Sequence, residues 1–235
     1  MRTGDFENHD IIKLLMPIIT DYMKRQTPEK IISQPTIKEK KAIEILFGIN
    51  RITECIDQIY FSIEMLSGFR KKKNSIINRH DHVVFMIENF YLRITSVFDR
   101  MLRFSNVIFD IGLPEKECRE STIIRNQKIK GTPVELALKK VDKLINDYKP
   151  IRNQVAHANT FQDDELSPIQ EFYYLIDKDT PELEKYKHFY KVRTDRYVNN
   201  KKEELIKSAN QIKKVTLEFF DSMVPYVKLN LKESE

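Results

Sequence analysis

Apolar residues recur at intervals of three and four along most of the chain, which is the spacing of one face of an α-helix. The first long run of this kind ends just before Gly68, and the capping-box pair Thr36 and Glu39 precedes it. The pattern predicts a long helix from about residue 42 to residue 66. Its apolar positions are Ala42, Ile45, Ile49, Ile52, Ile56, Ile59, Ile63 and Leu66.

A second run predicts the most regular helix, from about His82 to Asp110. Gly112 and Pro114 follow it, and both residue types end helices. The apolar column of this helix is Val83, Ile87, Phe90, Ile94, Val97, Met101, Phe104 and Ile108. A helix with one continuous apolar column packs that column against other helices.

The rest of the chain predicts shorter helices and one irregular stretch. A helix is expected at about 134–148 behind the cap Thr132-Pro133, another from Ile151, and a last long one from about Lys201 to Val227. Residues 161–200 are less periodic and are interpreted as an irregular insertion before the last helix. We therefore expect an all-α helical bundle forming a single domain over 1–235. Its parts are N-terminal helices at 1–69, a core at 82–160, the insertion at 161–200 and a C-terminal helix at 201–228.

Composition excludes several classes of site. The 5 glycines form neither a G-x-G-x-x-G nor a G-x-x-x-x-G-K-S/T string, and the 2 cysteines form no C-x-x-C pair. We therefore expect no nucleotide cofactor and no metal. The net charge of +5 permits a polyanionic partner. The first ten residues carry Asp5, Glu7 and Asp10 and do not resemble a signal peptide, so we expect a cytoplasmic protein without membrane association.

One string carries candidate chemistry: Arg152-Asn153-Gln154-Val155-Ala156-His157. Asn153 and His157 are four residues apart and share a helix face, whereas Arg152 is about 140° from His157 on an ideal helix. A guanidinium can clamp phosphate oxygens, an imidazole can move a proton near neutral pH, and an amide can orient a substrate. Together they suit metal-free cleavage of RNA by the ribose 2′-hydroxyl. The alternative is that these are surface residues of an ordinary helix.

That reaction needs a general acid and a general base, and each chain offers one histidine in this string. A two-fold dimer would place two copies across one cleft, so an enzyme of this kind is expected to be a homodimer.

The helix predicted at 82–110 offers a second polar set. Arg93, Ser96, Arg100 and Arg103 recur along one edge of its apolar face and could line a cleft that binds phosphates. The alternative is that the arginines pair with acids such as Asp99 or Glu88. Asp99 is a candidate supporting residue, which could orient an arginine or hold a dimer.

Two further groups favour structural interpretations. His80-Asp81-His82 suggests a metal site, but an exposed helix start is the simpler interpretation because no further ligands lie nearby in the sequence. The aromatic string Phe172-Tyr173-Tyr174 could stack on bases, but such residues more often pin an insertion to a bundle.

The string from Arg152 to His157 resembles the R-N-x-x-x-H signature of HEPN-domain proteins (higher eukaryotes and prokaryotes nucleotide-binding). The stretch from Tyr91 to Leu102, followed by Gly112-Leu113-Pro114 and Glu117-Cys118-Arg119, is similar to one bacterial subfamily of stand-alone HEPN proteins. The resemblance implies an all-α fold and a dimeric site with Arg152 and His157 as the catalytic pair. It also implies RNA products that end in a 2′,3′-cyclic phosphate.

These arguments predict a metal-independent endoribonuclease of a bacterial toxin–antitoxin or phage-defence type, with RNA as substrate and an antitoxin or regulatory protein as a possible partner. HEPN toxins that pair with nucleotidyltransferase antitoxins have a Tyr two residues after the His, where this chain has Asn159. That departure weighs against regulation by modification at this position. The alternative function is a non-catalytic helical module that binds nucleotides or RNA, or regulates a partner.

Overall fold

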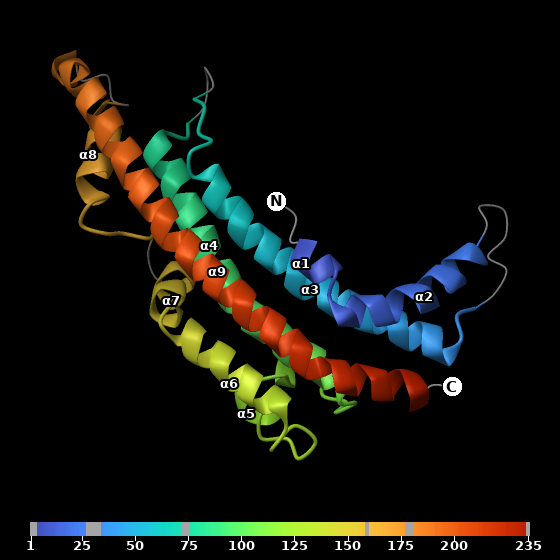
Figure 1. The fold of residues 1–235 in the computed structure, drawn as a ribbon. Helices are drawn as coiled ribbons and strands as arrows, with labels where there is room; N and C mark the ends of the chain where they lie inside the picture. Colours follow the sequence, from blue (N-terminus) through green and yellow to red (C-terminus); the bar gives the residue numbers. More distant parts are fainter. Residues whose placement is uncertain (1–3, 27–33, 72–75, 158–159, 177–180, 234–235) are drawn as a thin grey trace. The chain divides into compact units, whose positions relative to one another are not determined.

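The computed structural model describes residues 4–26, 34–71, 76–157, 160–176 and 181–233, and every regular element in these ranges is helical (Figure 1). The expected all-α fold is confirmed. The elements are α1 (Gly4–Glu7), α2 (Asp10–Lys24), α3 (Ile37–Met65), α4 (Arg79–Ile108), the 3₁₀ helix η1 (Glu115–Glu117), α5 (Glu120–Ile123), α6 (Pro133–Asn146), α7 (Lys149–His157), α8 (Ser167–Ile176), the 3₁₀ helix η2 (Pro181–Tyr186) and α9 (Lys187–Glu233).

The chain forms two compact units. Unit 1 comprises Met1–Asp57, Ser96–Ile145 and Ile212–Glu235, and unit 2 comprises Gln58–Thr95 and Asn146–Gln211. The long helices α3, α4 and α9 each contribute residues to both units. Within the described ranges, no helix combines the length and the apolar character needed to cross a membrane.

In unit 1, α3 begins at the capping box that the sequence predicts. The Thr36 N–H donates to Glu39 Oε2 at 2.8 Å, and the Glu39 N–H donates to Thr36 Oγ1 at 3.2 Å. The hydrogen bond from the Thr36 backbone lowers the pKa of the Glu39 carboxyl. The Glu39 carboxylate also pairs with Arg25 from the end of α2. The cap therefore fixes the first turn of α3 by reciprocal hydrogen bonds.

Aromatic rings form the centre of the unit 1 core. Phe104 of α4 lies 6.1 Å from Phe220 and 6.2 Å from Phe219 of α9, and Phe6 of α1 lies 5.7 Å from Phe220. All four rings are buried. A Cβ at Gly48 of α3 would come within 2.5 Å of Phe104 Cδ2, so glycine is required there for α3 to approach this ring.

The end of α4 follows the predicted stop signal. Helix α4 ends at Ile108, and the chain then turns through Asp110 and Gly112 with φ angles of 44° and 78°. Positive φ favours glycine, which explains Gly112 at this turn. Asn106 holds the turned chain, because its side chain donates to the Leu113 carbonyl and accepts from the Leu113 N–H, both at 3.0 Å. The predicted apolar column of α4, from Val83 to Ile108, is buried in full.

Unit 2 contains much of the segment 161–200, and its described part is more helical than the weak periodicity predicts. Helix α8 and the 3₁₀ helix η2 lie within it, and α9 begins at Lys187 instead of Lys201; residues 177–180 lie outside the described residues. Phe172 is buried and stacks on Tyr190 with ring centres 4.0 Å apart. The Tyr197 hydroxyl donates to Asp163 Oδ2 at 2.6 Å. Phe172 therefore pins the segment to α9, as the structural interpretation predicts.

Candidate functional site

The string from Arg152 to His157 lies on α7, the nine-residue helix Lys149–His157 in unit 2. The helix begins two positions before the predicted start at Ile151 and includes Pro150 in its first turn. Proline is tolerated there because first-turn N–H groups need no partner within the helix. The Arg152 N–H donates to the carbonyl of Tyr148, the residue before the helix, at 3.0 Å.

Helix α7 presents its polar side chains to solvent. No residue of α7 is buried: Asn153 and His157 are exposed, and Arg152 is half-buried. Asn153 and His157 are one helical turn apart on the same face. Within the described part of the chain, the side chains of Arg152, Asn153 and His157 form no hydrogen bond or ion pair. These groups are thus available to a ligand. Asn159 lies outside the described residues.

One buried tyrosine anchors the chain on both sides of α7. The Tyr91 ring of α4 lies 6.2 Å from Tyr148, which precedes α7, and 5.8 Å from Phe161, which follows it. The Phe161 N–H donates to Glu88 Oε1 at 2.7 Å, one turn of α4 before Tyr91. Burial raises the pKa of the Tyr91 hydroxyl well above its usual range, so this group stays neutral at physiological pH. Tyr91 therefore anchors both flanks through ring contacts, and the hydrogen bond to Glu88 adds to the anchor at Phe161.

The candidate substrate-binding residues of α4 divide between the two units. Ser96, Asp99, Arg100 and Arg103 line a pocket of about 830 Å³ in unit 1. Arg93 belongs to unit 2 and does not line this pocket; its Nε donates to Asn89 Oδ1 at 3.3 Å. The structure therefore brings four of the five α4 candidates to one pocket.

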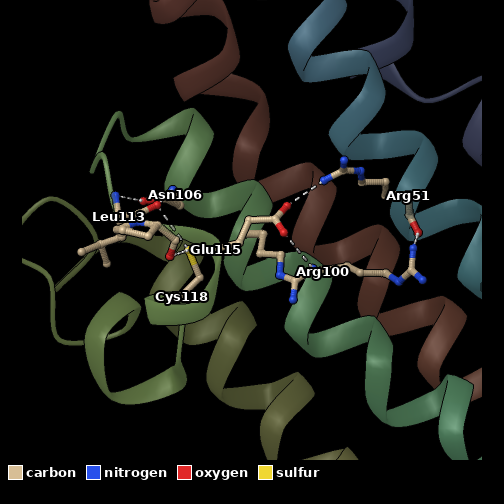
Figure 2. Close-up of polar contacts among 8 residues, drawn as sticks. Arg51, Arg100, Asn106, Leu113, Glu115 and Cys118 are labelled. Carbon is tan, nitrogen blue, oxygen red and sulfur yellow. Dashed lines mark hydrogen bonds and ion pairs between the residues drawn. The ribbon is translucent and has the colours of Figure 1, made fainter.

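The pocket contains a cluster of guanidinium groups around one carboxylate (Figure 2). Arg51 Nη1 of α3 donates to Glu115 Oε1 at 3.1 Å, and Arg103 Nη1 lies 3.7 Å from Glu115 Oε2. Arg100 Nη1 donates to the Arg51 carbonyl at 2.7 Å. The acid that engages Arg103 is thus Glu115, and not the sequence neighbours Asp99 or Glu88.

The segment that carries Glu115 is fixed from the other side. Asn106 holds Leu113, and the Cys118 thiol donates to the Pro114 carbonyl at 3.5 Å (Figure 2). Burial raises the pKa of the Cys118 thiol, so the sulfur remains a protonated donor and not a nucleophilic thiolate. The η1 helix between these two contacts places the Glu115 carboxylate among the arginines.

The predicted exposed start of α4 is wrong for His80. His80 is 6% exposed, and burial lowers its pKa, although the adjacent Asp81 partly opposes this. His82 Nε2 lies 2.7 Å from the Met65 carbonyl, a contact that fixes the start of α4 against the end of α3. The residues that the structure describes contain no group of three or more His, Cys, Asp or Glu side chains placed to hold a metal ion.

Sequence reasoning missed Arg51, Lys40 and Glu115 as pocket residues. The helix of Arg51 and the turn of Glu115 are distant along the chain, and only tertiary packing brings them together. Arg51 precedes the buried Ile52 of the apolar stripe, so a search of stripe borders on α3, like the one applied to α4, would have found it. No comparable signal distinguishes Glu115 from the charged residues that follow it, such as Lys116 and Glu117.

Comparison with curated proteins and with solved structures gives no match. A family model does match, over residues 40–223, which include most of α3, the whole of α4 and α7, and the pocket residues from Lys40 onward. This match covers most of the chain and includes the R-N-x-x-x-H string of α7. The chain belongs to the HEPN_Cthe2314-like HEPN family.

Proposed function

We propose that the protein is a metal-independent endoribonuclease and that α7 carries its catalytic groups. His157 is the general acid or base, Arg152 clamps the phosphate in the transition state, and Asn153 positions the substrate. The observation that carries this proposal is the placement of these three side chains on one helix, with Asn153 and His157 exposed, Arg152 half-buried and no partner for any of them among the described residues. Membership of the HEPN family supports the broader class, which is RNA cleavage or nucleotide binding.

The proposed reaction is an internal transesterification. A general base removes the proton of the ribose 2′-hydroxyl, and the 2′-oxygen forms a bond to the adjacent phosphorus. The bond from phosphorus to the 5′-oxygen breaks, and a general acid protonates that oxygen. The products are a 2′,3′-cyclic phosphate and a 5′-hydroxyl. Arg152 stabilises the negative charge that develops on the non-bridging oxygens.

The same proposal includes a homodimer and an RNA-binding surface. One histidine in each α7 supplies one proton-transfer group, so two copies provide both an acid and a base. Along α4, Arg93, Ser96, Arg100 and Arg103 bind RNA phosphates, and Asp99 orients an arginine. A cytoplasmic role in bacterial defence or in a toxin system, regulated by an antitoxin, fits such an activity.

The direct test is cleavage of a mixed RNA substrate by the purified protein in EDTA, with chemical analysis of the product ends. Wild type is expected to cut and to leave cyclic phosphates, and His157→Ala is expected to reduce the rate by about 100-fold or more. His188→Ala is the matched control, because it changes another exposed histidine of unit 2. Equal rates for wild type and His157→Ala would refute the proposal. RNA retention without cleavage would favour the binding-module alternative.

The shared site has its own test. In mixtures of wild type with His157→Ala, re-equilibrated at constant total protein, activity is expected to fall with the square of the wild-type fraction. This follows because a dimer then needs both imidazoles. A linear fall would show that each subunit cuts alone and would remove the dimeric site from the proposal.

A further inference from the structure

The arginine cluster of unit 1 holds an internal anion. The two oxygens of Glu115 face two different guanidiniums, Arg51 at 3.1 Å and Arg103 at 3.7 Å (Figure 2). One carboxylate between two guanidiniums is an arrangement that a phosphoryl group can reproduce, because its oxygens accept hydrogen bonds from several donors at once.

The contact that holds Glu115 is open to competition. The side chains of Arg51 and Glu115 are each 63% exposed, and that of Arg103 is 45% exposed. Ion pairs that are this exposed add little net stability, because water screens them and two long side chains lose freedom. A phosphate carries more charge and more acceptor oxygens than a carboxylate, so it can displace Glu115 without disturbing the core.

The pocket around the cluster suits more than a bare anion. Its volume of about 830 Å³ falls in the range of small-molecule sites. Its charged lining has a basic excess, formed by Lys40, Arg51, Arg100 and Arg103 against Glu44, Asp99 and Glu115. Phe47 and Ile43 of α3 add an apolar wall, and the Phe47 side chain is largely exposed. An exposed aromatic ring beside a basic cluster can pack against the organic part of a phosphate ester.

Arg100 has a different part in the cluster. Its Nη1 donates to the Arg51 carbonyl at 2.7 Å, which ties α4 to the turn of α3 that carries Arg51. A guanidinium has five N–H donors, and this hydrogen bond uses one of them. Arg100 therefore positions the cluster and still has donors for an anion.

We propose that this pocket binds a phosphate ester, with Arg51 and Arg103 holding its phosphoryl group in the place that the Glu115 carboxylate now occupies. Phe47 packs against the organic part of the ligand. The site lies within unit 1, whereas α7 lies in unit 2, and the proposal does not require that the protein cleave RNA.

The test is isothermal titration calorimetry of the full chain with inorganic pyrophosphate, AMP and a 2′-O-methyl RNA oligonucleotide that cannot undergo transesterification. Glu115→Gln removes the competing charge and is expected to tighten pyrophosphate binding about threefold, the effect of one exposed ion pair. Arg51→Gln and Arg103→Gln are expected to weaken it about tenfold each, because each removes a charge-assisted contact.

Matched controls come from the ion pair of Asp21 and Lys24 on α2, which is exposed, belongs to unit 1 and lies outside the pocket. Asp21→Asn and Lys24→Gln change charge by the same amounts and are expected to leave binding unchanged. Thermal melting of every variant verifies that the fold is intact.

The outcomes separate support from refutation. Tighter binding in Glu115→Gln together with weaker binding in the arginine variants supports the site. No heat of binding in either wild type or Glu115→Gln at millimolar pyrophosphate overturns it, as does equal binding in the arginine variants and their control. If Phe47→Ala weakens binding of AMP but not binding of pyrophosphate, Phe47 contacts the organic part of the ligand. Equal effects on the binding of both ligands would refute that role of Phe47.

The two ligand sources are distinguished by the probes. If Arg51→Gln and Arg103→Gln weaken binding of the oligonucleotide, the ligand is a phosphate within RNA. If they weaken binding of AMP alone, the ligand is a free phosphate ester. This experiment measures binding and not cleavage. A protein that binds phosphate through Arg51 but does not cut RNA would support this site and refute the proposed ribonuclease function.

Discussion

Helix α7 in unit 2 and the arginine pocket in unit 1 present polar groups in opposite ways. The side chains of Arg152, Asn153 and His157 have no partners among the described residues, and aromatic contacts with Tyr91 anchor both flanks of the helix. In the pocket, the guanidiniums are already engaged, by the Glu115 carboxylate and by the Arg51 carbonyl. Among the described residues, nothing competes with a ligand for Arg152, Asn153 and His157, whereas the arginines of the pocket must exchange one anion for another.

Because of this difference, substitutions in the two regions are expected to have different effects on stability. Removing Asn153 or His157 removes a proposed functional group and little packing, because both side chains are exposed. Changing the pocket changes an existing ion pair and, at Gly48 and Phe104, also the core behind it. Substitutions at the residues that support each region are therefore expected to affect stability to different extents.

The largest effect is expected at Tyr91, the anchor of both flanks of α7. Tyr91→Ala removes a ring that is 3% exposed and is expected to lower the free energy of unfolding by about 3–5 kcal/mol, measured by urea denaturation. Limited proteolysis should then cut near α7 faster than in wild type. Tyr91→Phe is the control, since it keeps the ring contacts and loses only the hydroxyl. If both substitutions released α7 equally, the aromatic anchoring would be refuted.

A smaller loss is expected at Gly48, which supports the pocket. The added methyl of Gly48→Ala meets the buried Phe104 ring, and overpacking of this kind costs about 1–3 kcal/mol. Alanine also favours the helix by up to about 1 kcal/mol, so the expected net loss is at most about 2–3 kcal/mol. Gly4→Ala, where nothing lies within 4 Å of the added atom, is the control for urea denaturation. A stabilised Gly48→Ala protein would contradict the close approach of α3 to Phe104.

The smallest effect is expected from acidification through His80 of unit 2. Burial lowers the pKa of His80 from its ordinary value of 6.5. As the pH falls below about 6.5, the unfolded chain binds a proton that the folded chain does not, so stability decreases down to the folded pKa. Melting temperatures between pH 7.5 and 5.5 should therefore fall more steeply for wild type than for His80→Asn. Parallel curves would show that His80 does not contribute.

Periodicity predicted the long helices because their apolar columns are continuous. The column of α4 is buried from Val83 to Ile108, and the capping box at Thr36 forms as the sequence predicts. The start of α9 was predicted too late because residues 187–200 have few buried positions, among them Thr194 and Tyr197, separated by charged residues. Such a helix is stabilised by contacts with residues distant in sequence, including the hydrogen bond from Tyr197 to Asp163.

The candidate sites also differ in whether local sequence signals or tertiary packing determine them. The string from Arg152 to His157 could be placed on a helix because its spacing and Pro150 are local signals. The convergence of Arg51 and Glu115 could not be predicted, because it depends on how α3 packs beside the turn after α4. Arg93 shares the spacing of Arg100 and Arg103 but lies in the other unit, since α4 contributes residues to both.

The anchoring of α7 at one ring has a consequence for engineering. The flanks of α7 both contact Tyr91 and no residue of the helix is fully buried, so its exposed positions can be substituted without loss of the anchor. Libraries that randomise the exposed positions Gln154 and Ala156 should retain the thermal stability of the parent. Altered RNA preference in such libraries would then report directly on substrate contacts.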